Sequence, residues 1–302
     1  MKKGILILIA ILICSCKSEK QDNGKLNIVT TTSMITDLVK NIGGDYINVQ
    51  GLMGSGVDPH LYKASEGDVS KLVNADIIFY NGLHLEGKLV EVFEKMGSAT
   101  KTPIALADAI DKTTLIGSDY FASNYDPHVW FNIEYFKQFA KKVTTVLSDK
   151  NPENSVNYVE NEKNYIAKLN TLQNNIKAAI ETLPAEKRIL VTAHDAFNYF
   201  GKNYGFEVVG LQGLSTATEA GVQDVQKLAA FIIEKKVKAI FVESSVPKRT
   251  IEALQAAVKS KGHEVIIGGT LFSDALGTAG TIEGTYLGMF KYNVNTIVNA
   301  LK

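Results

Sequence analysis

The sequence predicts an α/β protein of two lobes joined by one long rigid helix. Short runs rich in β-branched residues alternate with segments of helical periodicity, which favours parallel β-α units. These units fall into two sets, and one continuous helical pattern over residues 152–183 separates them. The chain has 302 residues, of which 45% are hydrophobic, so it is long enough for two domains that each bury a core.

The first residues of the chain have the pattern of an export signal, so we do not expect them to belong to the folded domains. Lys2 and Lys3 precede an unbroken apolar run over residues 5–13. As a helix this run covers roughly 14 Å, about half the hydrocarbon thickness of a membrane, so it is too short to span. A basic start, a short apolar run and small residues after it are typical of a secretory signal peptide, here predicted over residues 1–15.

The end of this signal resembles a bacterial lipobox. Small Ser15 precedes Cys16, whereas bulky Ile13 precedes Cys14, so Cys16 is the predicted site of lipid attachment. A plain signal peptide that contains two cysteines is the alternative. Residues 16–25 then form a polar, flexible tether. We expect a protein held in a bacterial cell envelope through its N-terminal lipid only, facing the periplasm or the exterior, with no disulfide framework.

The charges and the composition exclude several other classes of protein. The 32 Lys and Arg residues balance 32 Asp and Glu residues, and no basic stripe is present, so nothing predicts nucleic-acid binding. The composition is also unlike that of a collagen, a coiled coil or a disordered tail. We expect a monomeric globular protein.

Each lobe contains four predicted strands. In the first lobe they are Leu26–Thr30, Tyr46–Gly51, Ile77–Tyr80 and Ile104–Leu106. In the second lobe they are Ile189–Thr192, Glu207–Leu211, Ala239–Val242 and Glu264–Ile267. Helical patterns lie between them, at Met34–Ile42, Gly67–Asn74, Gly87–Met96, Val222–Lys235 and Thr250–Lys261. Ser33, Ser65 and Thr250 are candidate N-terminal helix caps.

The segment between the two sets predicts a single helix. Pro152 suits a first helical turn, and Pro184 ends the run. The apolar residues recur in helical steps and define one face: Val156, Val159, Ile166, Leu169, Leu172, Ile176, Ile180 and Leu183. A helix of about 30 residues extends roughly 45 Å, enough to run along two lobes. The predicted division is an N-terminal lobe over 26–150, a connecting helix over 151–184 and a C-terminal lobe over 185–302.

Two of the five histidines end the same tripeptide, Asp-Pro-His. His60 ends it at residues 58–60, and His128 ends it at residues 126–128. Proline fixes its own φ and keeps the preceding residue out of the helical region, so each histidine lies on a stiff turn. A stiff turn suits a metal ligand that must be positioned in advance, although two exposed turns produce the same pattern.

Two further candidates follow predicted strands. His194 comes just after the apolar strand at 189–192, and Asp274 lies past the last strand in a Gly-rich loop. Open α/β sheets bind ligands at the carboxyl ends of their strands. A helix cap is the alternative interpretation of Asp274. His84 also follows a strand, so its position does not exclude it as a metal ligand. His263 is predicted to be a surface turn residue.

Seven motifs in a fixed order are the most specific feature of the sequence. They are Gly-Val-Asp-Pro-His-Leu-Tyr at 56–62, Asn-Gly-Leu-His-Leu-Glu at 81–86, Asp-Pro-His-Val-Trp at 126–130, Thr-Ala-His-Asp-Ala-Phe at 192–197, Gly-Leu-Gln-Gly-Leu-Ser-Thr at 210–216, Phe-Val-Glu-Ser-Ser at 241–245 and Leu-Phe-Ser-Asp-Ala-Leu-Gly at 271–277. Together with the lipobox they resemble the cluster A-I (cluster 9) metal-binding solute-binding proteins of ABC importers, the TroA/ZnuA-like group. The resemblance covers nearly all of the chain after Lys25 and implies two α/β lobes with a metal-binding cleft between them.

The resemblance also implies a ligand set and a function. Carried over by position, the four metal ligands are His60 and His128 from the first lobe and His194 and Asp274 from the second. The implied function is capture of one divalent metal ion as cargo and its delivery to an ABC transporter permease, with no enzymatic activity. The resemblance does not make His84 a ligand, although it lies in a matching motif.

The donor set and one missing feature rank the metals. Three imidazoles and one carboxylate suit tetrahedral Zn²⁺, and a bidentate Asp274 could partly supply the oxygen that Mn²⁺ prefers. Zinc-dedicated relatives often carry a loop rich in His and acidic residues, and the corresponding segment 111–125 contains no His. The predicted order is zinc first, manganese close behind and iron third.

Two other function classes remain as alternatives. A secreted zinc hydrolase needs three protein ligands, an open coordination position and a general base such as Glu243. For Glu243 a structural ion pair is the simpler prediction. A binding lipoprotein for a small organic solute such as a sugar usually has a cleft lined with aromatic residues and Arg or Asp, but arginine occurs only at Arg188 and Arg249.

Overall fold

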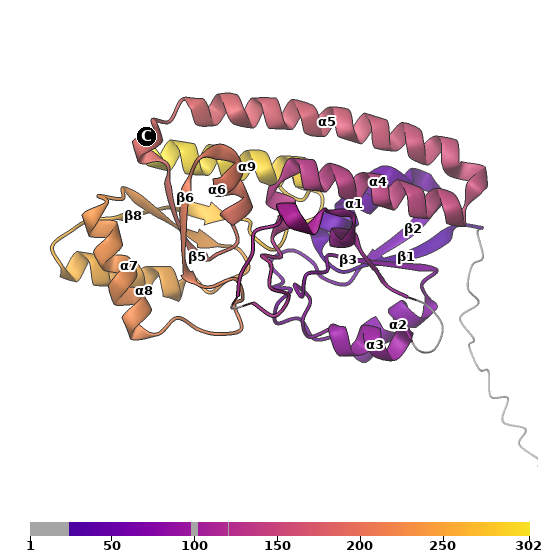
Figure 1. Cartoon of the computed structure of the whole chain (residues 1–302), viewed down its shortest axis with the longest axis horizontal. Coiled ribbons are helices and arrows are strands. Elements are labelled where there is room, and N and C mark those ends of the chain that lie inside the picture. The colour runs from indigo at the N-terminus through magenta and orange to yellow at the C-terminus, as the bar shows by residue number, and fades with distance from the viewer. Residues whose placement is uncertain (1–23, 98–101, 120) are drawn as a thin grey trace, which may run out of the picture.

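Two α/β lobes lie side by side, and one long helix runs along both of them (Figure 1). The computed structural model describes residues 24–97, 102–119 and 121–302. The predicted signal peptide, Cys16 and most of the tether lie outside these described residues. Parallel strands and covering helices build each lobe, which confirms the predicted fold class. The exact lobe boundaries at residues 150 and 185 stay a prediction.

The first lobe is a parallel sheet between two layers of helices. Its strands β1 (Leu26–Thr30), β2 (Ile47–Gly51), β3 (Ile77–Tyr80) and β4 (Ile104–Ala105) follow the order β2-β1-β3-β4. Successive side chains of a strand point to opposite faces. Ile28 accordingly packs in the core with the helices α1 (Ser33–Gly43) and α4 (Ile133–Lys150). Its neighbour Val29 packs in a second core with the helices α2 (Glu66–Asn74) and α3 (Val90–Gly97).

The second lobe repeats this plan with two strand pairs. The strand β5 (Ile189–His194) pairs with β6 (Glu207–Gln212), and β7 (Ala239–Glu243) pairs with β8 (Ile266–Leu271), all in parallel. The two pairs meet where β5 lies against β7. The helices α7 (Val222–Glu234) and α8 (Arg249–Ser260) cover one face, and α6 (Asn198–Tyr204) and α9 (Tyr286–Leu301) cover the other.

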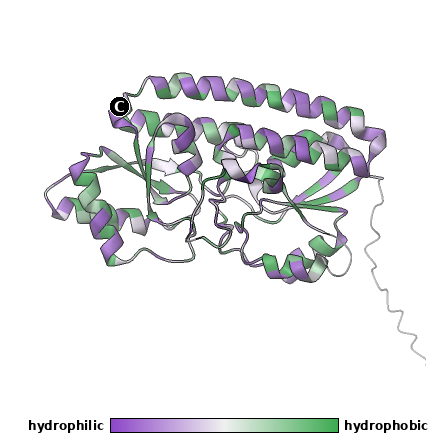
Figure 2. Cartoon of the chain, in the orientation of Figure 1, coloured by the Kyte–Doolittle hydropathy of each residue, from purple (hydrophilic) through white to green (hydrophobic). Residues whose placement is uncertain are grey.

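The helix that joins the lobes is α5 (Ser155–Glu181), which has 27 residues. It packs against α1 and α4 of the first lobe and against α9 of the second. Figure 2 shows hydrophilic and hydrophobic residues mixed along its whole length. Among the described residues, no helix combines the length and the apolar character needed to cross a bilayer.

The predicted apolar face of α5 is wrong at its beginning. Val156 and Val159 are 81% and 54% exposed, whereas Tyr158 and Tyr165 are buried. From Leu169 onward the predicted face is correct. Tyrosine has more apolar surface than valine, so burying the two rings against the first lobe removes more apolar area from water.

One of the three predicted helix caps is correct. Ser65 caps α2 in a reciprocal capping box with Asp68. Thr32, and not Ser33, caps α1, because the Ser33 hydroxyl instead accepts a hydrogen bond of 2.8 Å from the backbone of Leu276 in the other lobe. Thr250 lies inside α8 and donates its hydroxyl proton to the carbonyl of Pro247.

A shared aromatic core holds the two lobes together. Phe136 of the first lobe stacks on Tyr286 of the second, with ring centroids 3.8 Å apart. The hydroxyl of Tyr286 donates to the carbonyl of Trp130 at 2.6 Å. The Trp130 indole N–H donates to the carbonyl of Ser273, at 3.0 Å. These contacts place the loop of His128 directly against the loop of Asp274.

Candidate metal centre

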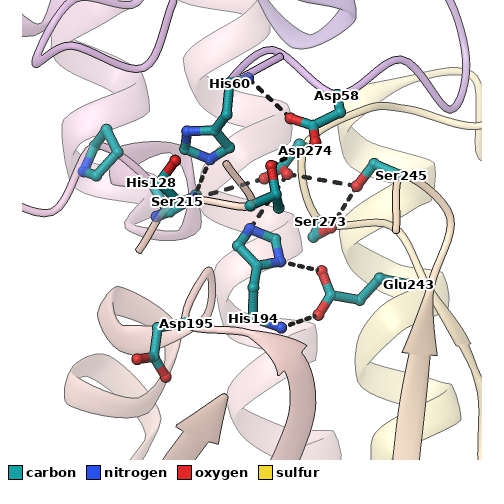
Figure 3. A network of polar contacts seen from close by, with 12 residues as sticks. Asp58, His60, His128, His194, Asp195, Ser215, Glu243, Ser245, Ser273 and Asp274 are labelled. Atoms are coloured by element: carbon teal, nitrogen blue, oxygen red, sulfur yellow. Dashed lines mark hydrogen bonds and ion pairs between the residues drawn. The ribbon is translucent and has the colours of Figure 1, made fainter. Parts of the chain in front are cut away.

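Four side chains from both lobes converge where the lobes meet (Figure 3). His60, His128, His194 and Asp274 each direct one ligand atom into a common space, and these atoms lie within 4.8 Å of one another. All four side chains are buried. The structure therefore brings together the complete set of residues that the sequence singled out as candidate ligands.

The two histidines of the first lobe lie on closed turns. The carboxylate of Asp58 accepts the backbone N–H of His60 at 2.8 Å, and Asp126 accepts the backbone N–H of His128 at 2.9 Å. The Nε2 atoms of the two imidazoles are 3.3 Å apart. His60 is 5% exposed and His128 is fully buried, so these turns are not the two exposed turns that the tripeptide also allowed.

The second lobe contributes its pair from the ends of two strands. His194 is the last residue of β5, and Asp274 lies three positions after the end of β8. Nε2 of His194 is 3.2 Å from Oδ2 of Asp274. The next helix, α9, is capped by Thr285, so the alternative interpretation of Asp274 as a helix cap is wrong.

Two buried carboxylates support the imidazoles from behind. Nδ1 of His128 is 2.7 Å from Oδ1 of Asp126. Nδ1 of His194 is 2.6 Å from Oε2 of Glu243, whose other oxygen accepts the backbone N–H of His194 at 2.9 Å. A carboxylate on Nδ1 keeps the proton there and leaves Nε2 free to bind a metal. Glu243 is thus a structural partner of His194, as predicted from the sequence.

The role of Asp126 was missed in the sequence, although a signal was present. Asp126 and Asp58 occupy the same position in the repeated tripeptide, two residues before a candidate histidine. Asp126 contacts the ring of its histidine, whereas Asp58 uses its second oxygen to accept the hydroxyl of Thr216 at 2.5 Å. Thr216 belongs to the second lobe, so this hydrogen bond joins the lobes beside His60.

The electrostatics of the centre favour a cation. Burial alone raises the pKa of Asp274, but His194 and the other two imidazoles outweigh it and hold this pKa well below its usual range. Burial lowers the pKa of His60 to about 3, so its imidazole is neutral at physiological pH. Burial also lowers the pKa of His194, but Asp274 and Glu243 dominate and raise it well above its usual value.

Buried polar atoms without hydrogen bonds mark the centre as a place for an ion. Oδ1 of Asp274 is buried without a hydrogen bond to any described residue, and so is Nε2 of His194 apart from its ion-pair contact with Oδ2 of Asp274. Such atoms are costly unless a ligand satisfies them. Three imidazole nitrogens and one carboxylate are the donors that first-row divalent metals accept.

The remaining histidines lie outside this group of four. His84 is exposed in the loop after β3, near Phe121. His263 is half-buried in the connection between α8 and β8.

Two α/β lobes with a buried group of three histidines and one aspartate between them define the class of two-lobed, metal-binding solute-binding proteins. Residues 28–300 match the ZnuA family, "Zinc-uptake complex component A periplasmic". The chain belongs to this family, which confirms the resemblance seen in its motifs.

Relatives with established names extend the match over the whole chain. The manganese-binding lipoprotein MntA of Bacillus subtilis is 46% identical, with 100% of both chains covered. The manganese ABC transporter substrate-binding lipoprotein PsaA of Streptococcus pneumoniae is 35% identical over 98% of this chain and 97% of its own. The solved structure of the periplasmic zinc-binding protein TroA of Treponema pallidum superposes with a TM-score of 0.89. It is 48% identical and covers 92% of this chain and 99% of its own. All three are named as metal-binding or substrate-binding proteins, and PsaA is named as part of a manganese ABC transporter.

Proposed function

We propose that the protein captures one divalent transition-metal ion, zinc or manganese, outside the cytoplasm and delivers it to an ABC transporter permease. The observation that carries this proposal is the convergence of His60, His128, His194 and Asp274 in a buried space between the lobes. An ion bound there contacts both lobes at once, so its binding stabilises their closed arrangement. The closed form is the one that docks on the permease.

The donor set supports zinc first, manganese second and iron third. Three imidazoles and a carboxylate complete a tetrahedral shell for Zn²⁺, and a bidentate Asp274 would raise the coordination number for Mn²⁺. By the Irving–Williams order such a site holds Zn²⁺ more tightly than Mn²⁺ whatever the cargo in the cell. The names of the relatives point to both metals, zinc for TroA and manganese for MntA and PsaA.

A lipid on Cys16 would keep the protein at the outer side of a bacterial membrane. The lipobox supports this proposal, and two of the relatives are named lipoproteins. The polar tether over residues 16–25 gives the lobes the reach to meet a permease in the same membrane. We propose that the protein works there as a monomer.

Neither the enzymatic alternative, a zinc hydrolase, nor the binding of an organic solute has support comparable to that for metal transport. Four protein ligands leave no open position on a tetrahedral ion for an activated water. Both oxygens of Glu243 already face His194, so this carboxylate is not placed as a general base. We therefore propose that the protein is not a hydrolase.

We expect the purified protein to bind one equivalent of Zn²⁺ or Mn²⁺ per chain and no sugar, measured by equilibrium dialysis. At free metal about 1,000-fold above Kd, binding adds about 4 kcal/mol to the free energy of unfolding. We expect the melting temperature to rise by roughly 8 °C as a result, measured by differential scanning calorimetry. Elemental analysis of protein isolated from its native membrane then identifies the cargo. Binding far below one equivalent, with no thermal shift, contradicts the proposal.

Metal affinity should fall as the pH is lowered. Asp274 and Glu243 raise the pKa of His194, so in the metal-free site Nε2 of His194 also carries a proton, beside Asp274, and the ion must displace it, whereas the proton on Nδ1 stays. One displaced proton changes the affinity by about tenfold per pH unit. Competition with a chelator between pH 7.5 and pH 5.5 measures this dependence. An affinity that stays constant over this range contradicts the displacement of a proton from His194.

A further inference from the structure

A small cavity reaches the centre from the side of His60. Its volume is about 130 Å³, and residues of both lobes line it, among them His60, His84, Phe121 and Ser215. His60 is the least enclosed of the four converging residues, at 5% exposure against 1% or less for the others. The cavity therefore meets the centre at the residue that an ion coming from solvent would reach first.

His84 is an exposed residue that also lines this cavity. Its imidazole is exposed and packs edge-on against the ring of Phe121, with centroids 6.2 Å apart. Phe121 packs edge-on against His60 as well, with centroids 6.5 Å apart. One phenyl ring thus contacts two imidazoles, one exposed to solvent and one inside the centre.

The backbone at His84 adopts a conformation that side chains rarely allow. Gly82, Leu83 and His84 have successive positive φ angles of 88°, 51° and 61°. Glycine adopts this region freely, but it is unfavourable for Leu83 and His84, and such residues concentrate at functional sites. A plain surface turn has no need of two consecutive non-glycine residues in this region.

Buried hydrogen bonds hold the His84 loop against a ligand turn. The Glu86 carboxylate accepts the backbone N–H groups of Asn81 and Gly82 and the hydroxyl of Thr31. The Asn81 side chain donates to the carbonyl of Pro127 at 3.0 Å, one residue before His128. The loop that carries the exposed imidazole is therefore fixed relative to the centre.

We propose that His84 is a transient metal ligand that receives the incoming ion and passes it through this cavity to His60. This inference rests on the proposed metal-binding function. A nitrogen of His84 replaces one water of the hydrated ion, and the nitrogen of His60 then replaces His84. Phe121 lies beside this path and excludes other solutes by its bulk. The positive charge of Lys88, which also lines the cavity, opposes the ion, so a specific ligand is needed to draw it in.

The test is a pair of rate constants measured by stopped flow with Zn²⁺ alone, in wild type and in His84→Gln. A transient ligand lowers the barrier in both directions. We therefore expect the association and dissociation rate constants to fall together by about fivefold, with Kd within about twofold. His263→Gln, which removes a histidine from the α8–β8 connection, is the matched control and should leave both constants unchanged.

Two further variants test the position and the charge. A Cβ at Gly87 would lie 2.9 Å from Nε2 of His84, so Gly87→Ala displaces the imidazole without removing it and should slow both rates. Lys88→Gln removes the opposing charge and should raise the association rate by about twofold at low ionic strength.

Each outcome is decisive. Unchanged rate constants in His84→Gln overturn the inference about His84. In that case equilibrium binding of Zn²⁺ by wild type still supports the proposed function. A Kd weakened by about tenfold or more with an unchanged association rate makes His84 a permanent ligand and also overturns it. Absence of metal binding by wild type overturns both the inference and the proposed function.

Discussion

Replacing Asp274 with asparagine is expected to weaken zinc binding by at least about 100-fold. Asp274 is the only anionic member of the converging group, and it is 1% exposed. A dication taken from water into this buried space keeps three neutral nitrogens in the variant but loses the one full negative charge. Attraction between opposite charges is several times stronger there than in bulk water, so the binding free energy falls by about 3 kcal/mol or more. Because roughly 1.4 kcal/mol corresponds to a factor of ten in Kd, this loss is at least about 100-fold.

The asparagine variant keeps the fold, so the loss reports on the charge. Its side chain has the same shape, and its carbonyl oxygen still accepts the hydroxyl of Ser245 that lies 3.4 Å from Oδ2 of Asp274. Competition against a chelator of known affinity at pH 7.5 measures Kd, and circular dichroism of the metal-free protein checks the fold.

Asp195→Asn is the matched control for this experiment. Asp195 adjoins His194 in the chain, but its carboxylate accepts the backbone N–H of Gly210 and lies away from the other three side chains (Figure 3). Its replacement removes the same charge from the same lobe, and we expect Kd to stay within about threefold. If both variants lose affinity equally, Asp274 acts through the general field of the protein and not as a ligand.

Local patterns in the sequence predict each candidate ligand but not their meeting point. Proline in the repeated tripeptide stiffens the turns of His60 and His128, and the end of an apolar strand places His194. Nothing in the spacing states that side chains from positions 60 and 274 share one space. That information comes from the packing of the lobes, through contacts such as the Trp130 indole on the carbonyl of Ser273. Only the resemblance to a family predicted the complete set.

Details that depend on competition between neighbours were also beyond the sequence. Val156 and Tyr158 both fit a helical pattern, and the larger ring takes the buried face because more apolar surface leaves water. Ser33 and Thr32 both suit a helix cap, and the contact of Ser33 with the other lobe decides between them. Such choices are made by tertiary contacts and not by local propensity.

Glu243 shows how a supporting residue controls a ligand, and Glu243→Gln is expected to weaken zinc binding by about 10- to 100-fold. One oxygen of Glu243 accepts the backbone N–H of His194, and the other lies 2.6 Å from its Nδ1. The glutamine side chain has one oxygen that accepts and one amide group that donates. If the oxygen keeps the backbone N–H of His194, the amide N–H faces Nδ1, which can then no longer hold a proton. The variant therefore favours the proton on Nε2, the atom that faces Asp274 and the space for the ion.

The readout must separate positioning from simple loss of structure. Glu207→Gln removes the same charge from an exposed position on β6 and should leave Kd unchanged. Nitrogen NMR of His194 in the metal-free protein reports which ring atom holds the proton, which a general destabilisation does not alter. We expect Nδ1 to hold a proton in wild type and Nε2 to hold the only ring proton in Glu243→Gln. A variant that binds zinc normally, with an unchanged ring, means that packing alone orients His194 and that the carboxylate behind it serves only to balance charge.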